Sequence, residues 1–421
     1  MNIWIVNPYG TLPSEGWREY RSSMLARALA DSGNEVTWWL SNFEHRSKKF
    51  RPSGLLKEGL LPDAVQIYSV PSSAYKSNIS LARIKYELTF GRNFVKYANS
   101  FTPPDVIVLA EPSLFFSSPV VRYSDKVGAK IILDVLDLWP EQFQVALPRI
   151  LKSIGRFLFF PLYQRRQRLV KRADGVVGVT KDHLKAVNVP VATPKLVAYL
   201  GLNYARFVFE SSRDPPIELR RFVQNSDLVV IYAGTLGEAY DIDSVMQAAE
   251  NVVQANNRVK FIFAGEGPYK NKIQGRIENY PANMLFVGKV PSEDLPAIYN
   301  ICQVGICSYS KDSTVTMPVK LYDYLAGGLY VAYSISGEID QLLKHNSCGS
   351  KYTAESPDEL SRMILSLVYV LDSKSIYKKC TELARSFDED VQHQLVAEFI
   401  EKLAGTDQHL LIKKTLRNNL S

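Results

Sequence analysis

Short apolar runs alternate with segments of helical periodicity along most of this chain. The first run, residues 1–6, ends in the loop NPYGTLPSEG, and apolar residues then recur at helical spacing up to Gly33. The next run, EVTWWLSN, has the composition of a strand. A strand, a helix and a second strand in this order make a βαβ unit, the element from which parallel sheets are built. The sequence therefore predicts an α/β protein.

The chain has 421 residues. This length exceeds a single hydrophobic core and predicts two domains of roughly 200 residues each. In the first half, further strands are expected at residues 65–70, 105–110 and 130–135. A charged, proline-rich segment, residues 210–221, is the expected linker between the domains.

The charge and the cysteines limit the class of protein. The formal net charge is +7, which favours an acidic partner such as a nucleic acid, an anionic membrane or a phosphorylated substrate. The 4 cysteines have no CxxC spacing and are expected to be small core residues in a reducing compartment. No apolar run reaches about 18 residues, so no segment is expected to span a membrane. We therefore expect a cytoplasmic or peripheral protein.

Residues 149–172 form the most charge-biased segment. Bulky apolar residues, among them Phe157, Phe159 and Phe160, lie between its cations, and no acidic residue interrupts it. This composition is typical of a segment that lies on an anionic lipid surface. The alternative is a long surface helix whose cations extend over a core-facing apolar stripe. The eight basic residues are Arg149, Lys152, Arg156, Arg165, Arg166, Arg168, Lys171 and Arg172.

Two loops that follow predicted strands carry candidate site residues. Asp137 follows the strand at 130–135 and would lie at its carboxyl end, where open α/β sheets bind ligands. The alternative is a plain turn, and for the nearby Glu141 the start of a helix is the favoured interpretation. In the second half, the run at 228–233 leads into Gly234, Thr235, Leu236 and Gly237. A glycine-rich loop between a strand and a helix can bind a diphosphate through its backbone amides.

Asp241 and Asp243 form a DxD pattern, which can hold a divalent metal. Capping of the helix that follows explains Asp241 better. The five histidines are scattered, and each is expected to be a surface or core residue. No metal site is predicted.

Residues 318–328, PVKLYDYLAGG, combine an anion site with a cation and a carboxylate. Pro318 is tolerated at a helix start because the first-turn amides have no acceptor, and those free amides attract an anion. Lys320 and Asp323 are three residues apart and can lie on one helix face, where they would contact a phosphate and a ribose hydroxyl. The alternative is an ordinary amphipathic helix with a solvated lysine and aspartate.

This stretch resembles the nucleotide-sugar signature of the retaining glycosyltransferases of family 4, in the branch with a P-x-K-L-x-[DE]-Y-x-A-x-G pattern. Lys320 matches the lysine of that branch, and Asp323 stands where the family has its second motif glutamate. The DLWPEQF turn at 137–143 and the GEGP turn that begins at Gly265 resemble further motifs of the branch. The resemblance covers most of the chain.

The resemblance implies the GT-B fold class, an α/β architecture of two Rossmann-like domains that face a central cleft. Residues 1–209 would form the acceptor-side domain, with the basic segment towards a membrane. Residues 210–387 would form the nucleotide-sugar domain. Residues 388–421 would provide a helix that crosses back to the first domain, followed by a basic tail.

The resemblance also implies the roles of individual residues. Asp137 would face the acceptor, Lys320 would stabilise the leaving diphosphate, and Glu338 would contact sugar hydroxyls. A nucleoside diphosphate sugar would be the donor, with neither a metal nor another cofactor. The expected donor-binding residues are Gly234, Thr235, Leu236, Gly237, Gly265, Lys320, Leu321 and Asp323.

Three features of the family pattern are missing. A pair of basic residues aligns with Thr235 and Tyr240, the first motif glutamate with Val315, and a cleft histidine with Leu136. Lys320, helix amides and Arg18 would replace the lost charge.

We predict a metal-independent, retaining glycosyltransferase of cell-surface polysaccharide synthesis. Its acceptor would be a lipid-linked or growing glycan, and it would lie on the inner face of the plasma membrane. The alternative is a catalytically silent GT-B subunit that binds a partner glycosyltransferase. An epimerase of the same architecture would need carboxylates and histidines that were not found, and nucleic-acid binding explains the charge but none of the motifs.

Overall fold

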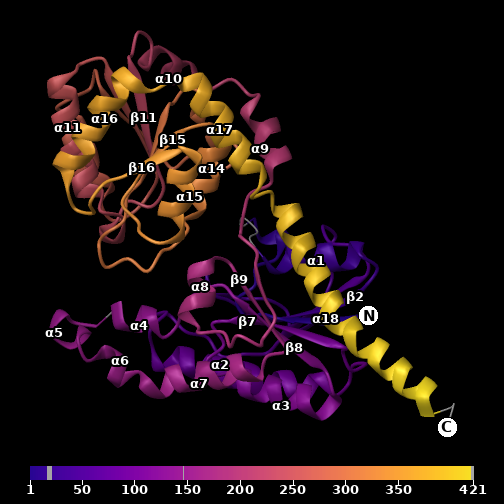
Figure 1. Ribbon diagram of the computed structural model, residues 1–421. Coiled ribbons are helices and arrows are strands. Elements are labelled where there is room, and N and C mark those ends of the chain that lie inside the picture. Colours follow the sequence, from indigo (N-terminus) through magenta and orange to yellow (C-terminus); the bar gives the residue numbers. More distant parts are fainter. Residues whose placement is uncertain (17–20, 146, 419–421) are drawn as a thin grey trace. The chain divides into compact units, whose positions relative to one another are not determined.

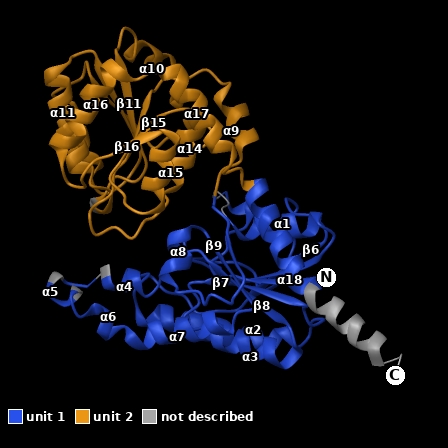
Figure 2. Ribbon diagram, viewed as in Figure 1, with its two compact units in different colours: residues 1–200, 390–421 blue, residues 201–389 orange. Residues whose placement is uncertain are grey.

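The structure, a computed structural model, describes residues 1–16, 21–145 and 147–418. For residues 145, 149, 152, 238 and 406–418 it describes the backbone alone. The chain divides into two compact units (Figures 1 and 2). Unit 1 comprises Met1–Leu200 with Asp390–Ser421, and unit 2 comprises Gly201–Glu389.

Unit 1 contains a sheet of eight strands in the order β10-β9-β8-β7-β1-β2-β6-β5. Neighbouring strands are parallel, except that β5 runs antiparallel to β6. The chain leaves β1 towards β2 on one side and continues from β7 on the other, so the strand order reverses between β1 and β7. The strands are β1 (Asn2–Val6), β2 (Glu35–Ser41), β5 (Gly54–Leu56), β6 (Val65–Val70), β7 (Val106–Glu111), β8 (Lys130–Val135), β9 (Gly175–Gly178) and β10 (Lys195–Val197). A small hairpin, β3 (Phe43–Glu44) with β4 (Lys49–Phe50), lies outside this sheet.

Helices cover both faces of the unit 1 sheet. Phe90 of α2, Val120 of α3 and Leu169 of α7 share one hydrophobic core with Trp4 of β1. On the opposite face, α1 and α18 pack against the alternate side chains of the same strands. The helices are α1 (Ser22–Asp31), α2 (Leu81–Ala98), α3 (Ser117–Val127), α4 (Glu141–Val145), α5 (Arg149–Lys152), α6 (Gly155–Leu158), α7 (Phe160–Arg172), α8 (Lys181–Ala186) and α18 (Glu389–Asn418), with a short 3-10 helix, η1 (Pro13–Glu15).

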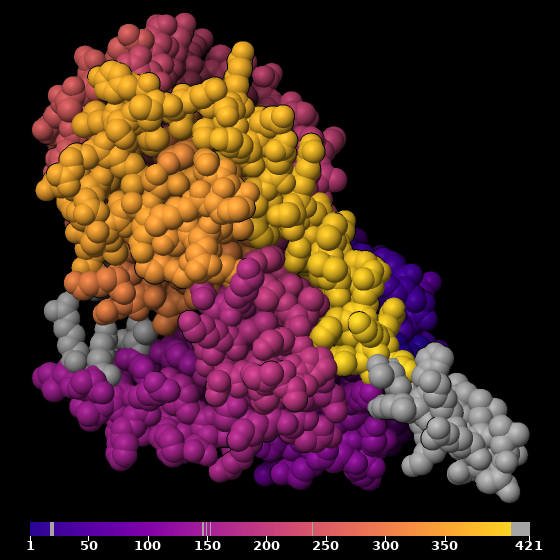
Figure 3. Space-filling model, viewed as in Figure 1, coloured from indigo at the N-terminus to yellow at the C-terminus, as the bar shows by residue number. Residues whose placement is uncertain are grey.

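The C-terminal helix α18 completes the core of unit 1. Val396, Ala397 and Ile400 are buried in the cluster that α1 also contributes to. The backbone amide of Tyr199 donates a hydrogen bond to Oε1 of Gln392 at 2.9 Å. In the space-filling view the yellow atoms of α18 lie against the magenta atoms of the segment that contains Tyr199 (Figure 3).

Unit 2 contains six parallel strands in the order β13-β12-β11-β14-β15-β16. All six residues of β11 are buried, because a parallel sheet covered on both faces needs a continuous apolar run. The strand order reverses between β11 and β14. The strands are β11 (Leu228–Ala233), β12 (Val259–Ala264), β13 (Met284–Gly288), β14 (Val304–Cys307), β15 (Tyr330–Tyr333) and β16 (Gly349–Lys351).

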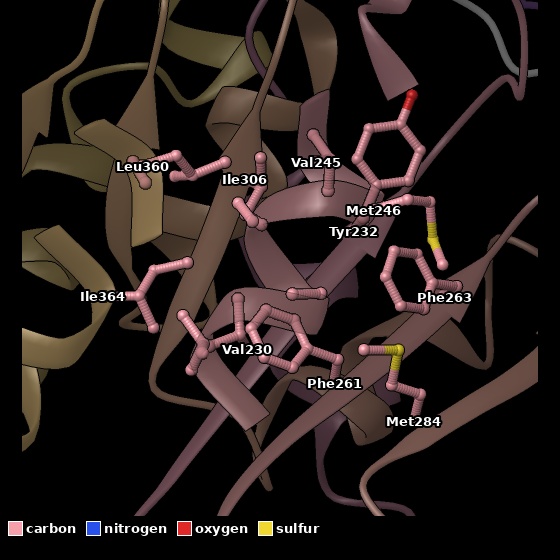
Figure 4. Packing of buried hydrophobic residues seen from close by; sticks show 14 of the residues in the cluster. Val230, Tyr232, Val245, Met246, Phe261, Phe263, Met284, Ile306, Leu360 and Ile364 are labelled. Carbon is pink, nitrogen blue, oxygen red and sulfur yellow. The ribbon is translucent and has the colours of Figure 1, made fainter. Parts of the chain in front are cut away.

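One face of the unit 2 sheet is covered by α11 and α16. Figure 4 shows Val230 and Phe261 from the strands packed with Val245 of α11 and Ile364 of α16. The helices of this unit are α9 (Tyr204–Ser211), α10 (Ile217–Phe222), α11 (Ile242–Ala255), α12 (Lys270–Ile277), α13 (Leu295–Tyr299), α14 (Val319–Ala326), α15 (Glu338–Asn346), α16 (Pro357–Val370) and α17 (Ser373–Arg385), with a 3-10 helix, η2 (Glu238–Tyr240).

The segment expected to be a linker is structured. Residues 210–221 include the end of α9 and most of α10, and both belong to unit 2. Glu210 and Leu219 are buried, and Glu210 accepts a 2.7 Å hydrogen bond from Arg206. The charged and proline-rich composition of residues 210–221 resembles that of a linker because two short helices meet there at the surface of unit 2.

Candidate functional site

The strand order of unit 2 identifies the edge of the sheet at which a ligand would bind. β11 and β14 are parallel neighbours, so the loops that follow them leave the sheet side by side. The chain crosses to opposite sides of the sheet at this point, which is where open α/β sheets bind ligands. The loop after β11 holds Gly234 to Gly237, and the loop after β14 leads into α14 and Lys320. The structure therefore brings two of the predicted motifs to one edge.

The glycine loops after β11 and β12 interlock. The Leu236 amide donates to Glu266 O at 2.9 Å, and the Gly265 amide donates to Gly288 O at 2.7 Å. Gly265 has a φ of +153°, and a Cβ placed on it would lie 1.8 Å from Gly234 O. A residue other than glycine would separate the loops. Because the Leu236 amide is already engaged and its side chain is buried, the expected diphosphate cradle cannot include that amide.

Lys320 places a buried ammonium group at this edge. Its Nζ is buried and has no hydrogen-bond partner among the described residues. The Nζ lies 4.3 Å from the ring centre of Tyr232, 5.3 Å from that of Tyr240 and 5.4 Å from that of Tyr309. Aromatic faces attract a cation, but they replace only part of its lost hydration. Burial accordingly lowers the pKa of Lys320 to about 8, although the nearby Cys307 acts in the opposite direction.

The first turn of α14 has the geometry that the sequence predicted. Pro318 occupies the N-cap position, so the free amides of the helix start follow it directly. Burial raises the pKa of the Cys307 thiol to about 12, Lys320 opposes that rise, and Asp323 adds to it. Lys320 and Asp323 are therefore both close to the same buried thiol on β14 and share a face of the helix. Leu321, by contrast, is fully buried in the core.

Glu338 is the first residue of α15, which follows β15. Its side chain is buried, and the preceding Gly337 has a φ of +104° that favours glycine. A carboxylate at this position is stabilised by the helix dipole. β15 is the parallel neighbour of β14, so Glu338 lies at the same edge of the unit 2 sheet as the start of α14.

Asp241 and Asp243, the two carboxylates of the DxD pattern, both have partners within unit 2. Asp243 pairs with Lys272 at 2.6 Å, whereas the carboxylate of Asp241 accepts a hydrogen bond from the Glu355 amide at 2.8 Å. Asp241 occupies the N-cap position of α11. Within the described ranges no three His, Cys, Asp or Glu side chains gather as a metal site requires.

Unit 1 has polar residues at the carboxyl edge of its own sheet. Asp137 follows β8, as predicted, and is exposed. Sequence reasoning missed Glu111, which ends β7 beside the point where the strand order reverses. Glu111 is fully buried, its Oε2 accepts from the amide and hydroxyl of Ser113, and its Oε1 has no partner among the described residues. Burial raises its pKa to about 7, with Ser113 and Arg166 opposing the rise. An acid at the end of the apolar run VIVLAE was the available signal.

His183 was also missed as a residue that shapes this edge. It lies on α8, and its Nδ1 is 2.8 Å from Thr180 Oγ1. A further hydrogen bond joins the imidazole to the backbone of Leu136. Burial lowers the pKa of His183 to about 4, so the ring is neutral at neutral pH. The imidazole therefore fixes the loop that presents Asp137, next to the position where the family pattern has its histidine.

The basic segment is only partly exposed. Arg166 is buried and donates to both carboxylate oxygens of Glu141, at 2.6 and 2.7 Å, and to the Trp139 carbonyl at 2.6 Å. Arg172 pairs with Asp125. The expectation that the whole run faces lipid is therefore wrong for Arg166, because its charge is used inside unit 1. The exposed cations whose side chains are described are Arg156, Arg168 and Lys171.

Arg18, expected to add charge to the donor site, lies outside the described residues. None of the helices in the described part of the chain is both long and apolar enough to cross a membrane.

Comparison with known proteins finds similarity in sequence for most of unit 2. Residues 218–386, less than half of the chain, match the family of glycosyl transferases group 1. The chitobiosyldiphosphodolichol beta-mannosyltransferase of Candida glabrata is 25% identical over 171 residues, which are 37% of this chain and 36% of that protein. The alpha-monoglucosyldiacylglycerol synthase of Streptococcus pneumoniae is 23% identical over 190 residues, or 43% of this chain and 42% of that protein. The matches thus span about two fifths of these relatives.

The whole chain resembles solved structures. Sucrose-phosphate synthase from Thermosynechococcus elongatus superimposes with a TM-score of 0.71 at 14% identity, covering 96% of this chain and 99% of that one. The likeness shows the fold, which consists of two Rossmann-like domains of the GT-B class. The fold class predicted from the sequence is confirmed.

Proposed function

We propose that this protein is a glycosyltransferase that moves a sugar from a nucleoside diphosphate sugar to a hydroxyl group of a lipid-linked or growing glycan. The observation that carries the proposal is the buried Lys320 ammonium at the ligand-binding edge of unit 2, which has no hydrogen-bond partner among the described residues. The match of residues 218–386 to the group 1 family supports it. An unpaired buried charge destabilises a fold, and a diphosphate would supply the missing counter-charge.

The proposed chemistry concerns the leaving group. As the bond between the sugar and the diphosphate breaks, negative charge increases on the phosphate oxygens. A preorganised cation and free helix amides stabilise that charge without reorganisation. Lys320 and the first turn of α14 would have this role. Because Lys320 has a pKa of about 8, it is mostly charged at neutral pH, and a bound diphosphate would raise that pKa.

The remaining predicted residues would position the substrates. Asp323 would accept a hydrogen bond from the ribose of the donor, and Glu338 would contact sugar hydroxyls. Gly265 would keep the two glycine loops close enough for the donor to approach the backbone. Asp137, exposed on unit 1, would face the acceptor. In this scheme the reaction retains the anomeric configuration and needs no metal.

A lipid-linked acceptor is part of the proposal. Both curated relatives have names that contain a lipid, diphosphodolichol in one and diacylglycerol in the other. On this chain, Phe157 is 83% exposed and Ile150 is 89% exposed within the basic segment. Exposed bulky apolar side chains next to exposed cations fit the interface of an anionic bilayer. We therefore place the protein on the inner face of the plasma membrane, in cell-surface polysaccharide synthesis.

The first test is stabilisation by a nucleotide. A ligand present at about 100 times its dissociation constant should add about 2.7 kcal/mol to the free energy of unfolding. UDP and GDP should therefore be compared for the shift that each causes in the melting temperature. A silent subunit that only binds a partner glycosyltransferase would respond to neither nucleotide.

The second test is turnover. The purified protein is incubated with a panel of nucleotide sugars and a membrane lipid extract, and the release of free nucleoside diphosphate is followed. Chelator should leave the rate unchanged, and NMR of the product should show the donor's anomeric configuration. Release that never depends on lipid would contradict the proposed acceptor, and an inverted product would contradict retention.

A further inference from the structure

Unit 1 contains a cavity of about 330 Å³ that the proposed reaction leaves unused. It lies between the start of α2 and the segment that contains α4 to α7. Its volume is within the range of small-molecule pockets, about 300 to 1,000 Å³. Most of its wall is hydrocarbon, contributed by Ile79, Ile84, Phe143, Leu147, Phe159 and Leu162.

The charged side chains of the cavity already have partners. The Arg83 guanidinium donates to Asn78 O at 3.1 Å and to the Tyr9 hydroxyl at 3.3 Å, and it stacks 4.0 Å from the Trp139 ring. Glu87 accepts a 2.5 Å hydrogen bond from Tyr9 and lies 3.8 Å from Arg83. A nucleotide or a sugar would have to compete with these bonds. An apolar ligand would leave them intact and would fill a space that water occupies poorly.

Exposed apolar residues surround the cavity. Ile79 and Leu81, which line it from the α2 side, are 52% and 84% exposed. On the other side Phe160, next to the lining residue Phe159, is also exposed. Figure 1 shows α2, α6 and α7 along one face of unit 1. Arg156 and Arg168 are exposed on α6 and α7, and the guanidinium of Arg165 on α7 lies 5.7 Å from the ring centre of Phe115, which lines the cavity.

We propose that this cavity binds the first part of the hydrocarbon chain of the anionic lipid that carries the acceptor glycan. The apolar wall takes the chain, the exposed apolar rim meets the bilayer from which the chain emerges, and the cations match the negative head group. The inference rests on the proposed function, because the acceptor must be lipid-linked. It adds a binding site on unit 1 that holds the lipid during transfer.

A cavity-filling substitution tests the site. Ile84→Trp would occupy the cavity, whereas Leu88→Trp places the same side chain one turn later on α2, at a half-exposed position that does not line it. KM is measured for an acceptor with a long isoprenoid chain and for a water-soluble analogue whose chain has only a few carbons. We expect Ile84→Trp to raise KM at least tenfold for the long chain alone, and Leu88→Trp to change neither value. Equal KM values for wild type and Ile84→Trp, or an equal change for both acceptors, would overturn the inference.

A direct binding assay tests the lipid site independently of the proposed glycosyl transfer. The apolar fluorophore N-phenyl-1-naphthylamine should bind the wild type, and farnesyl diphosphate should displace it. Ile84→Trp should weaken this binding at least tenfold, while Leu88→Trp retains it. If these results hold without any glycosyl transfer, the function fails and the lipid site stands. If transfer occurs but the wild type does not bind the fluorophore, the lipid site fails and the function stands.

A second variant covers the case in which Ile84→Trp does not fold. Ile79→Glu lies at the half-exposed rim of the cavity, where a polar side chain is tolerated. The carboxylate would repel both the chain and its anionic head. We expect at least tenfold weaker displacement by farnesyl diphosphate with an unchanged melting temperature. Displacement equal to that of the wild type would overturn the inference.

Discussion

The two units differ in whether a buried cation has hydrogen-bond partners among the described residues. In unit 2 the Lys320 ammonium is buried among three tyrosine rings and has no hydrogen-bond partner in the described part of the chain. In unit 1 the buried Arg83 is bound to Tyr9 and to a backbone carbonyl, beside Glu87. Folding alone does not require an unpaired cation, so its presence indicates an anionic ligand. Paired charges beside an apolar wall leave that wall free for the uncharged hydrocarbon part of a ligand.

The candidate sites of the two units also differ in whether backbone or side chains form them. In unit 2 the candidate donor site depends on how closely the two glycine loops approach, because a Cβ on Gly265 would lie 1.8 Å from Gly234 O. In unit 1 the candidate lipid surface depends on exposed side chains of short helices. A single added methyl group should therefore damage unit 2, whereas damage to the surface of unit 1 should need several charge changes.

The largest expected effect is that of Gly265→Ala. The new Cβ would lie 1.8 Å from Gly234 O at a φ of +153°, so the backbone must move. Backbone strain and overpacking each cost about 1 to 3 kcal/mol, and together they should lower the free energy of unfolding by about 2 to 6 kcal/mol. Denaturant titration measures this change, and nucleotide binding should be lost with it.

Gly275→Ala is the matched control. Gly275 lies in α12 of the same unit, and nothing lies within 4 Å of the added Cβ. Alanine in a helix interior is favoured over glycine by about 1 kcal/mol. The control should be as stable as the wild type or slightly more stable. Equal destabilisation by the two substitutions would show that the close approach of the glycine loops is not what Gly265 provides.

The next effect concerns the exposed cations of unit 1. Reversal of Arg156, Arg168 and Lys171 to glutamate should remove about 1 kcal/mol of attraction for each cation, or roughly a hundredfold in vesicle binding. Co-sedimentation with anionic vesicles at low salt measures it, and high salt should release the wild type. Nucleotide binding by unit 2 should remain unchanged.

The matched control reverses three exposed lysines of α17 in unit 2, namely Lys374, Lys378 and Lys379. Net charge then changes by the same amount at a different place. Equal loss of vesicle binding in both triple variants would mean that only net charge matters. If the wild type bound neutral and anionic vesicles equally well, an electrostatic contribution to vesicle binding would be excluded.

Lys320→Met should weaken nucleoside diphosphate binding at least tenfold, about 1.4 kcal/mol, because the leaving group loses its cation. The same change should leave the melting temperature unchanged or raise it, since it removes a buried charge without a partner. Calorimetry and thermal unfolding measure the two effects. Lys272→Met, at an exposed position on α12, is the control and should alter neither property. Unchanged nucleotide affinity in Lys320→Met would remove this residue from the site.

The sequence predicted the framework of unit 2 because each step had a local cause. The apolar run 228–233, the glycines after it and the proline that begins residues 318–328 each impose a local conformation, and β11, the glycine loop and α14 follow from them. The sharing of one helix face by Lys320 and Asp323 also follows from spacing alone. What spacing could not show is that three tyrosines from different segments surround the ammonium.

Unit 1 was less predictable because its site depends on contacts between distant segments. Glu111 is buried at the end of β7, His183 contacts the backbone of Leu136 from α8, and Arg166 is held inside unit 1 by Glu141. His183 and Arg166 have an ordinary sequence context, and only the apolar run before Glu111 gave a signal. Burial, which decides their roles, is a property of the folded chain.

The smallest expected effect is a pH dependence of nucleotide affinity that the unit 1 surface should not share. Lys320 has a pKa of about 8, below the usual value of about 10.4, and only its charged form attracts a diphosphate. Between pH 7 and pH 8 the charged fraction falls from about nine tenths to one half, so affinity should fall roughly twofold. Titration calorimetry in buffers of different ionisation enthalpy should also detect proton uptake on binding near pH 8.

Without a ligand, the stability of the fold should change with pH in the opposite direction to the nucleotide affinity. Between pH 8 and about 10.4 the unfolded chain binds the proton that folded Lys320 has lost, so this group makes folding more favourable as pH rises. Lys320→Met removes both effects and corrects for any titration of the nucleotide itself. A wild-type affinity that is constant from pH 7 to pH 8, with no proton uptake, would mean that the Lys320 ammonium does not meet the diphosphate.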